Sequence, residues 1–245
     1  MAREDPELYA ADTTEIRVLL VDDHQLLTDA LSRLLSREGD ITVVGVAGTV
    51  AEAKAAARQR IDVVLMDYRL PDGTGAEATR AIKARWPVAR VVMLTALDDD
   101  ETVLDSIRAG ADGYLTKDRA LDDVVGAVRA AYAGEVLLPR SVIAGIAQRV
   151  AAVRERETVG APAEPLTGRE IEVLRALAQG LPTGEISTRL GIAPNTLRTH
   201  VHNIMGKLRV HSKLEAVVFA FRHRLVESPP SDERLPWPGL PGARD

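Results

Sequence analysis

Residues 61–73 read IDVVLMDYRLPDG and hold the pattern on which the fold prediction rests. The apolar run 61–66 is short and rich in Val, Leu and Ile, which predicts a buried β-strand that stops at Asp67. A helix is predicted for residues 75–86, closed by Pro87. Strand, acidic residue and helix make one βα unit, so this stretch predicts an α/β domain with Asp67 at a strand end.

The same strand-and-helix pattern repeats through the first half of the chain. The predicted strands cover 16–21, 41–46, 61–66, 90–94 and 113–116, and the predicted helices cover 26–35, 50–60, 75–86, 99–109 and 121–133. Strands this continuously apolar indicate a parallel sheet with helices on both faces. Right-handed crossovers then give an α/β doubly wound (βα)5 domain.

From residue 166 the pattern is purely helical, with four short helices separated at 180–182, 191–194 and 209–211. Two of these helices are predicted to begin with capping boxes, one from Thr167 to Glu170 and one from Ser212 to Glu215. We therefore predict a small all-α domain after the α/β domain. The predicted organisation is an N-terminal tail 1–14, an α/β domain 15–136, a linker 137–164 with a helical part at 139–153, a helical domain 165–227 and a disordered Pro-rich tail 228–245.

Composition removes several classes of function. The 245 residues include no Cys, which excludes disulfides, thiol nucleophiles and Cys-based zinc sites. There is no apolar run of about 18 residues and no apolar signal segment, so we expect a cytoplasmic protein without membrane contact. Residues 15–135 hold 15 Lys and Arg against 21 Asp and Glu, a net charge of −6, whereas residues 165–226 hold 9 against 4, a net charge of +5. This asymmetry suggests that only the second part meets a polyanion, although solvated faces of ordinary charge explain it equally well.

Polar residues that can bind a metal ion or a phosphoryl group follow four of the predicted strands: Asp22 and Asp23, Asp67, Thr95 and Lys117. In open α/β sheets such residues converge at the carboxyl edge. Three close carboxylates favour a hard divalent cation, for which we predict Mg²⁺, and a carboxylate nucleophile forms an acyl phosphate. Lys117 supplies a charge for phosphoryl oxygens and Thr95 a hydroxyl. Each residue alone has an ordinary explanation, as a helix cap, a solvated charge or a residue that favours β-strands. The prediction of a phosphoryl site rests on all five residues lying at the ends of four predicted strands.

Residues 185–192 and 194–201 read EISTRLGI and PNTLRTHV, which predicts helix, tight turn, helix. Gly191 suits the turn and Pro194 the first turn of the second helix. Helical spacing predicts that Leu197, Val201, Ile204 and Leu208 are buried and that Arg198, Thr199 and His202 face outward. A helix with such an outward face fits the DNA major groove, although an ordinary helical domain with a solvated basic face gives the same pattern.

The four strand-end motifs, VDDH at 21–24, LMDYRLPDG at 65–73, LTA at 94–96 and GYLTK at 113–117, resemble those of bacterial receiver domains over residues 16–134. The resemblance implies that Asp67 is the phosphoacceptor and that Lys117 contacts the phosphoryl group. It also implies that Asp22, Asp23, Asp67 and the backbone carbonyl of Arg69 hold Mg²⁺. Thr95 would move toward the phosphoryl group, and Tyr114 would switch between outward and inward rotamers.

The motifs at 166–174, 185–186 and 196–208 resemble the LuxR-type helix-turn-helix, so the whole chain is similar to the NarL/FixJ class of response regulators. The resemblance implies a sensor histidine kinase and double-stranded DNA as partners. It also implies a homodimer when the protein is phosphorylated or DNA-bound, paired through the helix at 212–224, and a receiver that masks the recognition helix before phosphorylation. The implied DNA-binding residues are Asn195, Thr196, Arg198, Thr199, His202 and Lys207, the last toward backbone phosphate.

Three residues depart from the LuxR-type pattern. Ala193 stands where a Ser or Thr usually caps the recognition helix, Gly184 where a basic residue is frequent, and His202 where Lys is frequent. The missing cap costs about 1 kcal/mol of helix stability. The departures concern the affinity for DNA and the operator sequence.

Two alternatives stay open from the residues alone. Haloacid-dehalogenase-like phosphatases also use an Asp nucleophile with Mg²⁺, but they place a second acid two residues later, where this chain has Arg69. We therefore expect no enzyme activity of that kind. The other alternative is a LuxR-type regulator that binds DNA without using phosphorylation.

Overall fold

The computed structural model describes residues 15–95, 100–135, 137 and 164–226. The predicted tails 1–14 and 228–245 and the predicted linker helix 139–153 lie outside the described residues. The domain boundaries within these segments therefore stay predictions.

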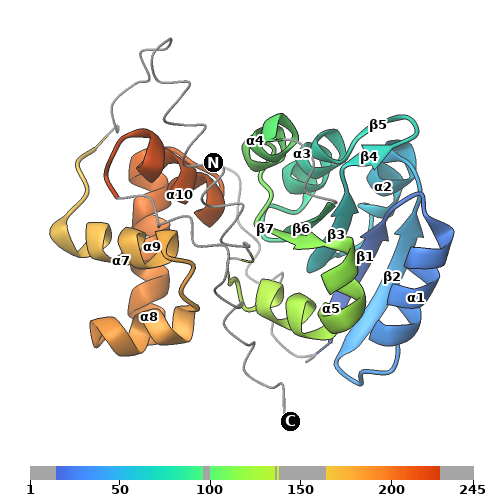
Figure 1. Ribbon diagram of the computed structural model, residues 1–245, viewed down its shortest axis with the longest axis horizontal. Helices are drawn as coiled ribbons and strands as arrows, with labels where there is room; N and C mark the ends of the chain where they lie inside the picture. Colours follow the sequence, from blue (N-terminus) through green and yellow to red (C-terminus); the bar gives the residue numbers. More distant parts are fainter. Residues whose placement is uncertain (1–14, 96–99, 136, 138–163, 227–245) are drawn as a thin grey trace, which may run out of the picture.

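The first half folds around a five-stranded parallel sheet with the order β2-β1-β3-β6-β7 (Figure 1). The chain starts near the middle of the sheet, turns to one edge and returns to build the other, which confirms the predicted doubly wound topology. The strands are β1 Ile16–Val21, β2 Ile41–Ala47, β3 Val63–Asp67, β6 Arg90–Thr95 and β7 Gly113–Thr116.

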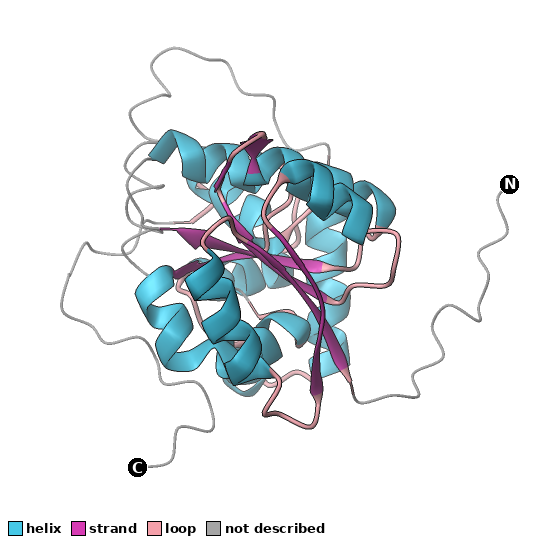
Figure 2. Cartoon of the chain, turned by 90° about the vertical axis from the view of Figure 1, so that its right-hand side faces the viewer, coloured by secondary structure: helices cyan, strands magenta, loops and turns pink. Residues whose placement is uncertain are grey.

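Helices cover both faces of this sheet, as Figure 2 shows in the view onto the first half. Successive strand residues point to opposite faces: Leu20 and Leu65 pack in one buried cluster, Leu19 and Met66 in the other. The helices are α1 Gln25–Leu35 and α5 Lys117–Tyr132 on one face, and α2 Val50–Ala56, α3 Gly75–Arg85 and α4 Asp100–Arg108 on the other.

The observed elements differ from the predicted ones mainly at their ends. Strand β3 includes Asp67, α2 ends at Ala56, and α5 begins at Lys117 with a non-helical residue at Asp123 (φ −148°, ψ 51°). The short hairpin of β4 (Arg69–Leu70) and β5 (Gly73–Thr74) was not predicted. Two-residue strands are too short for hydrophobic alternation to reveal them.

The second part is helical, with α7 Gly168–Ala178, α8 Thr183–Leu190, α9 Pro194–Leu208 and α10 Lys213–Arg222. The predicted capping box at Thr167 is complete, since its hydroxyl accepts from Glu170 N and the Glu170 carboxylate accepts from Thr167 N. The second box is only half formed. Ser212 accepts from the Glu215 backbone, but the Glu215 carboxylate accepts from the N–H of His211 at 2.7 Å.

Candidate functional site

Strand register brings the predicted strand-end residues to one edge of the sheet. Val21 pairs with Met66, Asp67 pairs with Leu94, and Thr95 pairs with Thr116, so the carboxyl ends of the central strands are level. Asp22 comes directly after β1, Asp67 and Thr95 end their strands, and Lys117 follows β7 as the first residue of α5.

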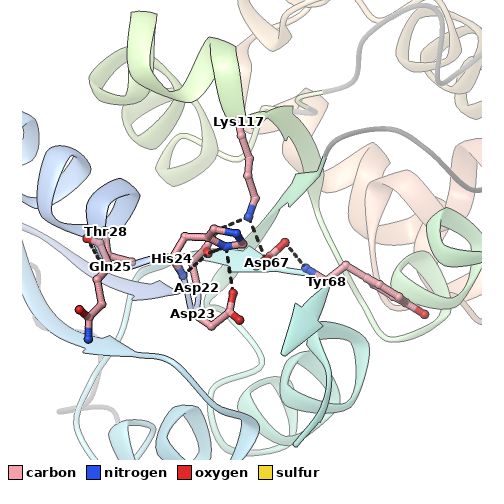
Figure 3. Close-up of polar contacts among 8 residues, drawn as sticks. All are labelled: Asp22, Asp23, His24, Gln25, Thr28, Asp67, Tyr68 and Lys117. Atoms are coloured by element: carbon pink, nitrogen blue, oxygen red, sulfur yellow. Dashed lines mark hydrogen bonds and ion pairs between the residues drawn. The ribbon is translucent and has the colours of Figure 1, made fainter. Parts of the chain in front are cut away.

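Three carboxylates and one ammonium group form the acidic pocket, which we define as Asp22, Asp23, Asp67 and Lys117 (Figure 3). Lys117 Nζ lies 2.7 Å from Asp22 Oδ2 and 2.9 Å from Asp67 Oδ2, so it bridges the ends of two strands. Asp22 and Asp67 are buried, with 3% and 6% of their surface exposed, whereas Asp23 is exposed. The other oxygen of Asp67, Oδ1, accepts a hydrogen bond from Tyr68 N at 2.8 Å.

Burial and charge act against each other in the acidic pocket. Burial raises the pKa of the Asp67 carboxyl, and nearby Asp22 raises it further, although the hydrogen bond from Lys117 opposes both effects. Burial lowers the pKa of the Lys117 ammonium group, but its hydrogen bonds to Asp22 and Asp67 outweigh this and raise the pKa. Lys117 therefore stays charged, and its charge is aimed at the oxygens of Asp67.

The donor set of the acidic pocket fits a divalent cation. Asp22, Asp23, His24 and Asp67 each offer a ligand atom, and these atoms all lie within 4.8 Å of one another. Carboxylate oxygens are the ligands that Mg²⁺ prefers. Arg69 follows in β4 with an exposed side chain, and the role of its backbone carbonyl stays a prediction. The sequence prediction omitted His24, although its place directly after two acids was a visible signal.

Tyr114 occupies an inward position in β7. The residue is 2% exposed, its hydroxyl donates to the carbonyl oxygen of Val103 in α4 at 2.7 Å, and burial raises the pKa of that hydroxyl. Thr95 ends β6, which lies between β3 and β7 in the sheet, and its backbone pairs with Thr116 of β7. Tyr114 thus links β7 to α4, and the switching roles of Thr95 and Tyr114 stay predictions.

The helix-turn-helix is built by α8 and α9. Gly191 ends α8 with a left-handed backbone (φ 62°), which a side chain would strain, and Pro194 begins α9. Ala193 makes no side-chain cap. The four residues predicted to be buried on α9 are all buried: Leu197, Val201, Ile204 and Leu208.

The predicted DNA-binding residues divide into two groups. Asn195, Thr196, Arg198, Thr199 and His202 are exposed on α9. Lys207 instead points inward, and its Nζ lies 2.8 Å from Oε2 of buried Glu170, which belongs to the capping box of α7. Lys207 thus makes an ion pair within the domain, and its contact with backbone phosphate stays a prediction. Thr199 also donates to the carbonyl of Asn195, within its own helix.

The two parts of the chain meet near the end of α5. Lys213, the first residue of α10, donates to the carbonyl of Gly134, and burial beside Arg90 lowers the pKa of its ammonium group to about 8. Helix α10 also contacts α4. A cavity of about 280 Å³ lies at this junction, lined by Ala133 and Glu135 of the first part and by residues that include Thr183, Pro194 and Arg198 of the second.

Comparison with known proteins gives two family matches that coincide with the two parts. Residues 18–129 match the response regulator receiver domain and residues 164–220 match the luxR family of bacterial regulatory proteins. The fold and the matches together define a receiver joined to a LuxR-type helix-turn-helix. Among the described residues, no helix has the length and apolar character needed to cross a bilayer.

Two relatives that match over most of the chain agree with this assignment. The chain is 37% identical over 214 residues to an uncharacterized transcriptional regulatory protein, YxjL, of Bacillus subtilis, covering 87% of this chain and 98% of that protein. It is 36% identical to the response regulator protein VraR of Staphylococcus epidermidis, covering 86% and 99%. A LuxR-family response regulator structure from Aurantimonas sp. SI85-9A1 is 33% identical, with 58% of this chain and 99% of that chain covered and a TM-score of 0.49. The chain belongs to the DNA-binding response regulators of two-component systems, as the resemblance to the NarL/FixJ class predicted.

Proposed function

We propose that Asp67 is the residue on which this response regulator receives its phosphoryl group, from a sensor histidine kinase. The observation that carries this proposal is the pairing of Lys117 with both Asp22 and Asp67 at the carboxyl edge of the sheet. An ammonium group held beside the Asp67 carboxylate is placed to stabilise the oxygens of an incoming phosphoryl group.

In the proposed reaction an Asp67 oxygen attacks the phosphorus of the donor. A P–O bond to Asp67 forms while the bond from phosphorus to the leaving group breaks, which yields an acyl phosphate. Asp22, Asp23, Asp67 and the Arg69 carbonyl would hold Mg²⁺, which when bound neutralises charge on the transferred group. Lys117 exchanges part of its pairing with Asp67 for the new phosphoryl oxygens, and the Thr95 hydroxyl donates to them.

Intact mass spectrometry tests this proposal. The full chain incubated with acetyl phosphate and Mg²⁺ is expected to gain the mass of one phosphoryl group, and Asp67→Asn is expected to gain none. Asp29→Asn makes the same chemical change at an exposed position on α1 and serves as the control. Phosphorylation that persists in Asp67→Asn would contradict the assignment, and no phosphorylation of the wild type would favour a phosphorylation-independent regulator.

For the DNA-binding part, we propose that the exposed face of α9 enters the major groove. Arg198 is the central residue of this face, with Asn195, Thr196, Thr199 and His202 around it. Lys207 would act through its ion pair with Glu170, which fixes the end of α9 against α7. In the DNA-bound dimer, α10 would pair the two copies.

Arg198→Ala tests this face. Loss of a base contact from Arg is expected to weaken binding to the selected operator by about 1–3 kcal/mol, with a smaller loss on random DNA. Arg58→Ala, an exposed Arg of the receiver, is the control. Binding is measured by fluorescence anisotropy on the duplex that the protein itself enriches from a random pool. Equal losses on operator and random DNA would show that Arg198 reads no base.

We further propose that the receiver limits the approach of α9 to DNA in the described arrangement by its position beside α9, while the predicted contact residues themselves stay exposed. Arg198 lines the cavity between the receiver and α9, and Lys213 holds the start of α10 against the end of α5. Because Tyr114 bonds α4 and α4 contacts α10, a change at Asp67 has a route to α10 through packed elements. Phosphorylation would shift the population toward an arrangement in which α9 and α10 are free.

A further inference from the structure

We propose that His24 is a metal ligand, and that it raises the affinity of the acidic pocket for Co²⁺, Ni²⁺ and Zn²⁺ while leaving that for Mg²⁺ unchanged. The inference deepens the proposed function, since it concerns the pocket that would hold Mg²⁺ during phosphoryl transfer. It adds a nitrogen ligand to a set of oxygen ligands, which changes the class of ion that the pocket selects.

The imidazole of His24 lies over the acidic pocket. Its Nδ1 is 2.9 Å from Asp22 Oδ1 and 2.9 Å from Asp23 Oδ1 (Figure 3). His24 occupies the N-cap position of α1, but its side chain makes no capping hydrogen bond. Its backbone N–H donates to Asp22 Oδ1 at 2.9 Å, which fixes the turn that directs the ring over the two carboxylates.

The three donor atoms have the spacing of neighbouring ligands around one ion. Ligands about 2.1 Å from a six-coordinate ion stand about 3 Å apart when they are adjacent. The observed separations of 2.9 Å are hydrogen-bond distances and are also close to this spacing. The His24 side chain is 67% exposed and that of Asp23 is 40% exposed, so water has access to the remaining coordination positions.

Lys117 does not compete for this position. It pairs with Oδ2 of Asp22, while His24 faces Oδ1 of the same carboxylate. Asp22 therefore contacts two neighbours through its two oxygens: Oδ2 contacts the Lys117 ammonium group, and Oδ1 contacts the His24 imidazole. An ion held by Asp22 Oδ1, Asp23 Oδ1 and His24 Nδ1 would leave the Lys117–Asp67 pair in place.

Ligand chemistry assigns the ions. Imidazole nitrogen suits Ni²⁺, Co²⁺ and Zn²⁺, whereas Mg²⁺ prefers oxygen ligands and retains bound water. A His beside two carboxylates is therefore expected to strengthen the binding of the former ions and to contribute nothing to Mg²⁺. The recognition-helix and surface His residues lie in the other part of the chain and provide controls.

Calorimetric titration of the full-length protein with CoCl₂, NiCl₂, ZnCl₂ and MgCl₂ at one pH tests the proposal. His24→Asn is expected to weaken the binding of the first three ions by about tenfold or more and to change Mg²⁺ affinity by less than about twofold. The Co²⁺ absorption spectrum of the wild type is expected to lose its nitrogen-ligand signature in His24→Asn. His211→Asn, at an exposed position in the other part, is expected to change neither.

Further variants make the result decisive. Asp22→Asn is expected to weaken all four ions, which places the titrated ions in the acidic pocket. Retained Co²⁺ affinity in Asp22→Asn, equal losses of Co²⁺ and Mg²⁺ in His24→Asn, or no loss at all would each overturn the proposal. Phosphorylation of His24→Asn by acetyl phosphate with Mg²⁺ is a separate readout. Its persistence keeps the proposed function intact whatever the titrations give.

Discussion

At the scale of single residues, Asp67 is held in a position that is unfavourable for its own charge. Its carboxylate is buried beside Asp22, and among the described residues Lys117 and the N–H of Tyr68 offset the loss of hydration. A carboxylate that is poorly satisfied in the resting protein gains from a reaction that gives it a new, solvated partner. In the proposed function, this cost to stability accompanies the phosphoacceptor role of Asp67.

This cost predicts that Asp67→Asn stabilises the receiver. Burial raises the pKa of Asp67, so the folded chain binds this proton more tightly than the unfolded chain does. Stability is therefore lost as pH rises from the ordinary carboxyl value through the raised one, and the full cost is present at neutral pH. Removing the charge is expected to raise the free energy of unfolding by on the order of 1 kcal/mol at pH 7.

Urea unfolding followed by circular dichroism, in EDTA to remove metal ions, measures the effect. The gain is expected to shrink toward zero as the pH falls well below the ordinary carboxyl pKa of 3.8, where Asp67 is protonated in both states. A variant that is less stable than the wild type at pH 7 would mean that the Lys117–Asp67 pair outweighs the cost of burial.

The sequence could predict that these strand-end side chains meet, because the position after each parallel strand is fixed by topology. Asp22, Asp67 and Lys117 needed only the right strand order to converge. His24 and Lys207 show the limit of this reasoning. Whether a side chain turns toward a neighbour or toward solvent depends on local backbone angles and on partners such as Asp23 and Glu170.

At the scale of elements, the beginning of α3 packs directly against the backbone of Asp67 and Tyr68. The N–H of Gly75 donates to the carbonyl of Tyr68 at 2.8 Å, and a Cβ on Gly75 would lie far inside contact distance of the Asp67 carbonyl oxygen. The close approach of helix and strand therefore requires glycine at this position. It also makes α3 part of the support for the acidic pocket.

We expect Gly75→Ala to destabilise the receiver by about 2–3 kcal/mol, because backbone atoms on both sides must move apart. Phosphorylation by acetyl phosphate is expected to slow as well, since the carbonyl of Asp67 shifts. Gly184→Ala is the control: it lies in α8 with nothing within 4 Å of its added Cβ, and should gain up to about 1 kcal/mol. Equal stability of the two variants in thermal unfolding would refute the close-approach argument.

The recognition helix offers a second prediction at this scale. Ala193 has the extended backbone of a capping residue (φ −65°, ψ 150°) but no side-chain acceptor. Ala193→Ser supplies one and is expected to stabilise the helical domain by about 1 kcal/mol, whereas Thr167→Ala, which breaks the capping box of α7, is expected to cost about the same. Guanidinium unfolding of the full chain measures both, and equal signs for the two variants would argue against the capping account.

At the scale of the whole molecule, the junction between the receiver and the helical part decides whether α9 reaches DNA. The Glu135 carboxyl lies at this junction, where burial raises its pKa while Lys213 and a hydrogen bond with Thr183 of α8 oppose the rise. Glu135 thus connects the receiver to both α8 and α10. No periodicity or motif indicated this contact, because the packing of two domains depends on surfaces that each domain presents only after folding.

Reversing the charge of Glu135 is expected to open the junction. Glu135→Lys places a cation against Lys213 and Arg198, so the unphosphorylated variant should bind its operator several-fold more tightly than the unphosphorylated wild type. Glu38→Lys makes the same change in net charge on the receiver surface near α1 and controls for general attraction to DNA. Equal gains in the two variants, measured by anisotropy, would attribute the effect to net charge alone.

The central claim is that a phosphoryl group on Asp67 controls how the helix-turn-helix meets DNA. Operator binding by the wild type before and after treatment with acetyl phosphate and Mg²⁺, with Asp67→Asn treated identically, tests it most directly. The account predicts that treatment tightens binding by the wild type and steepens its salt dependence, because more phosphate contacts form, and leaves Asp67→Asn unchanged. Equal affinities and equal salt slopes for the treated wild type and Asp67→Asn would contradict it.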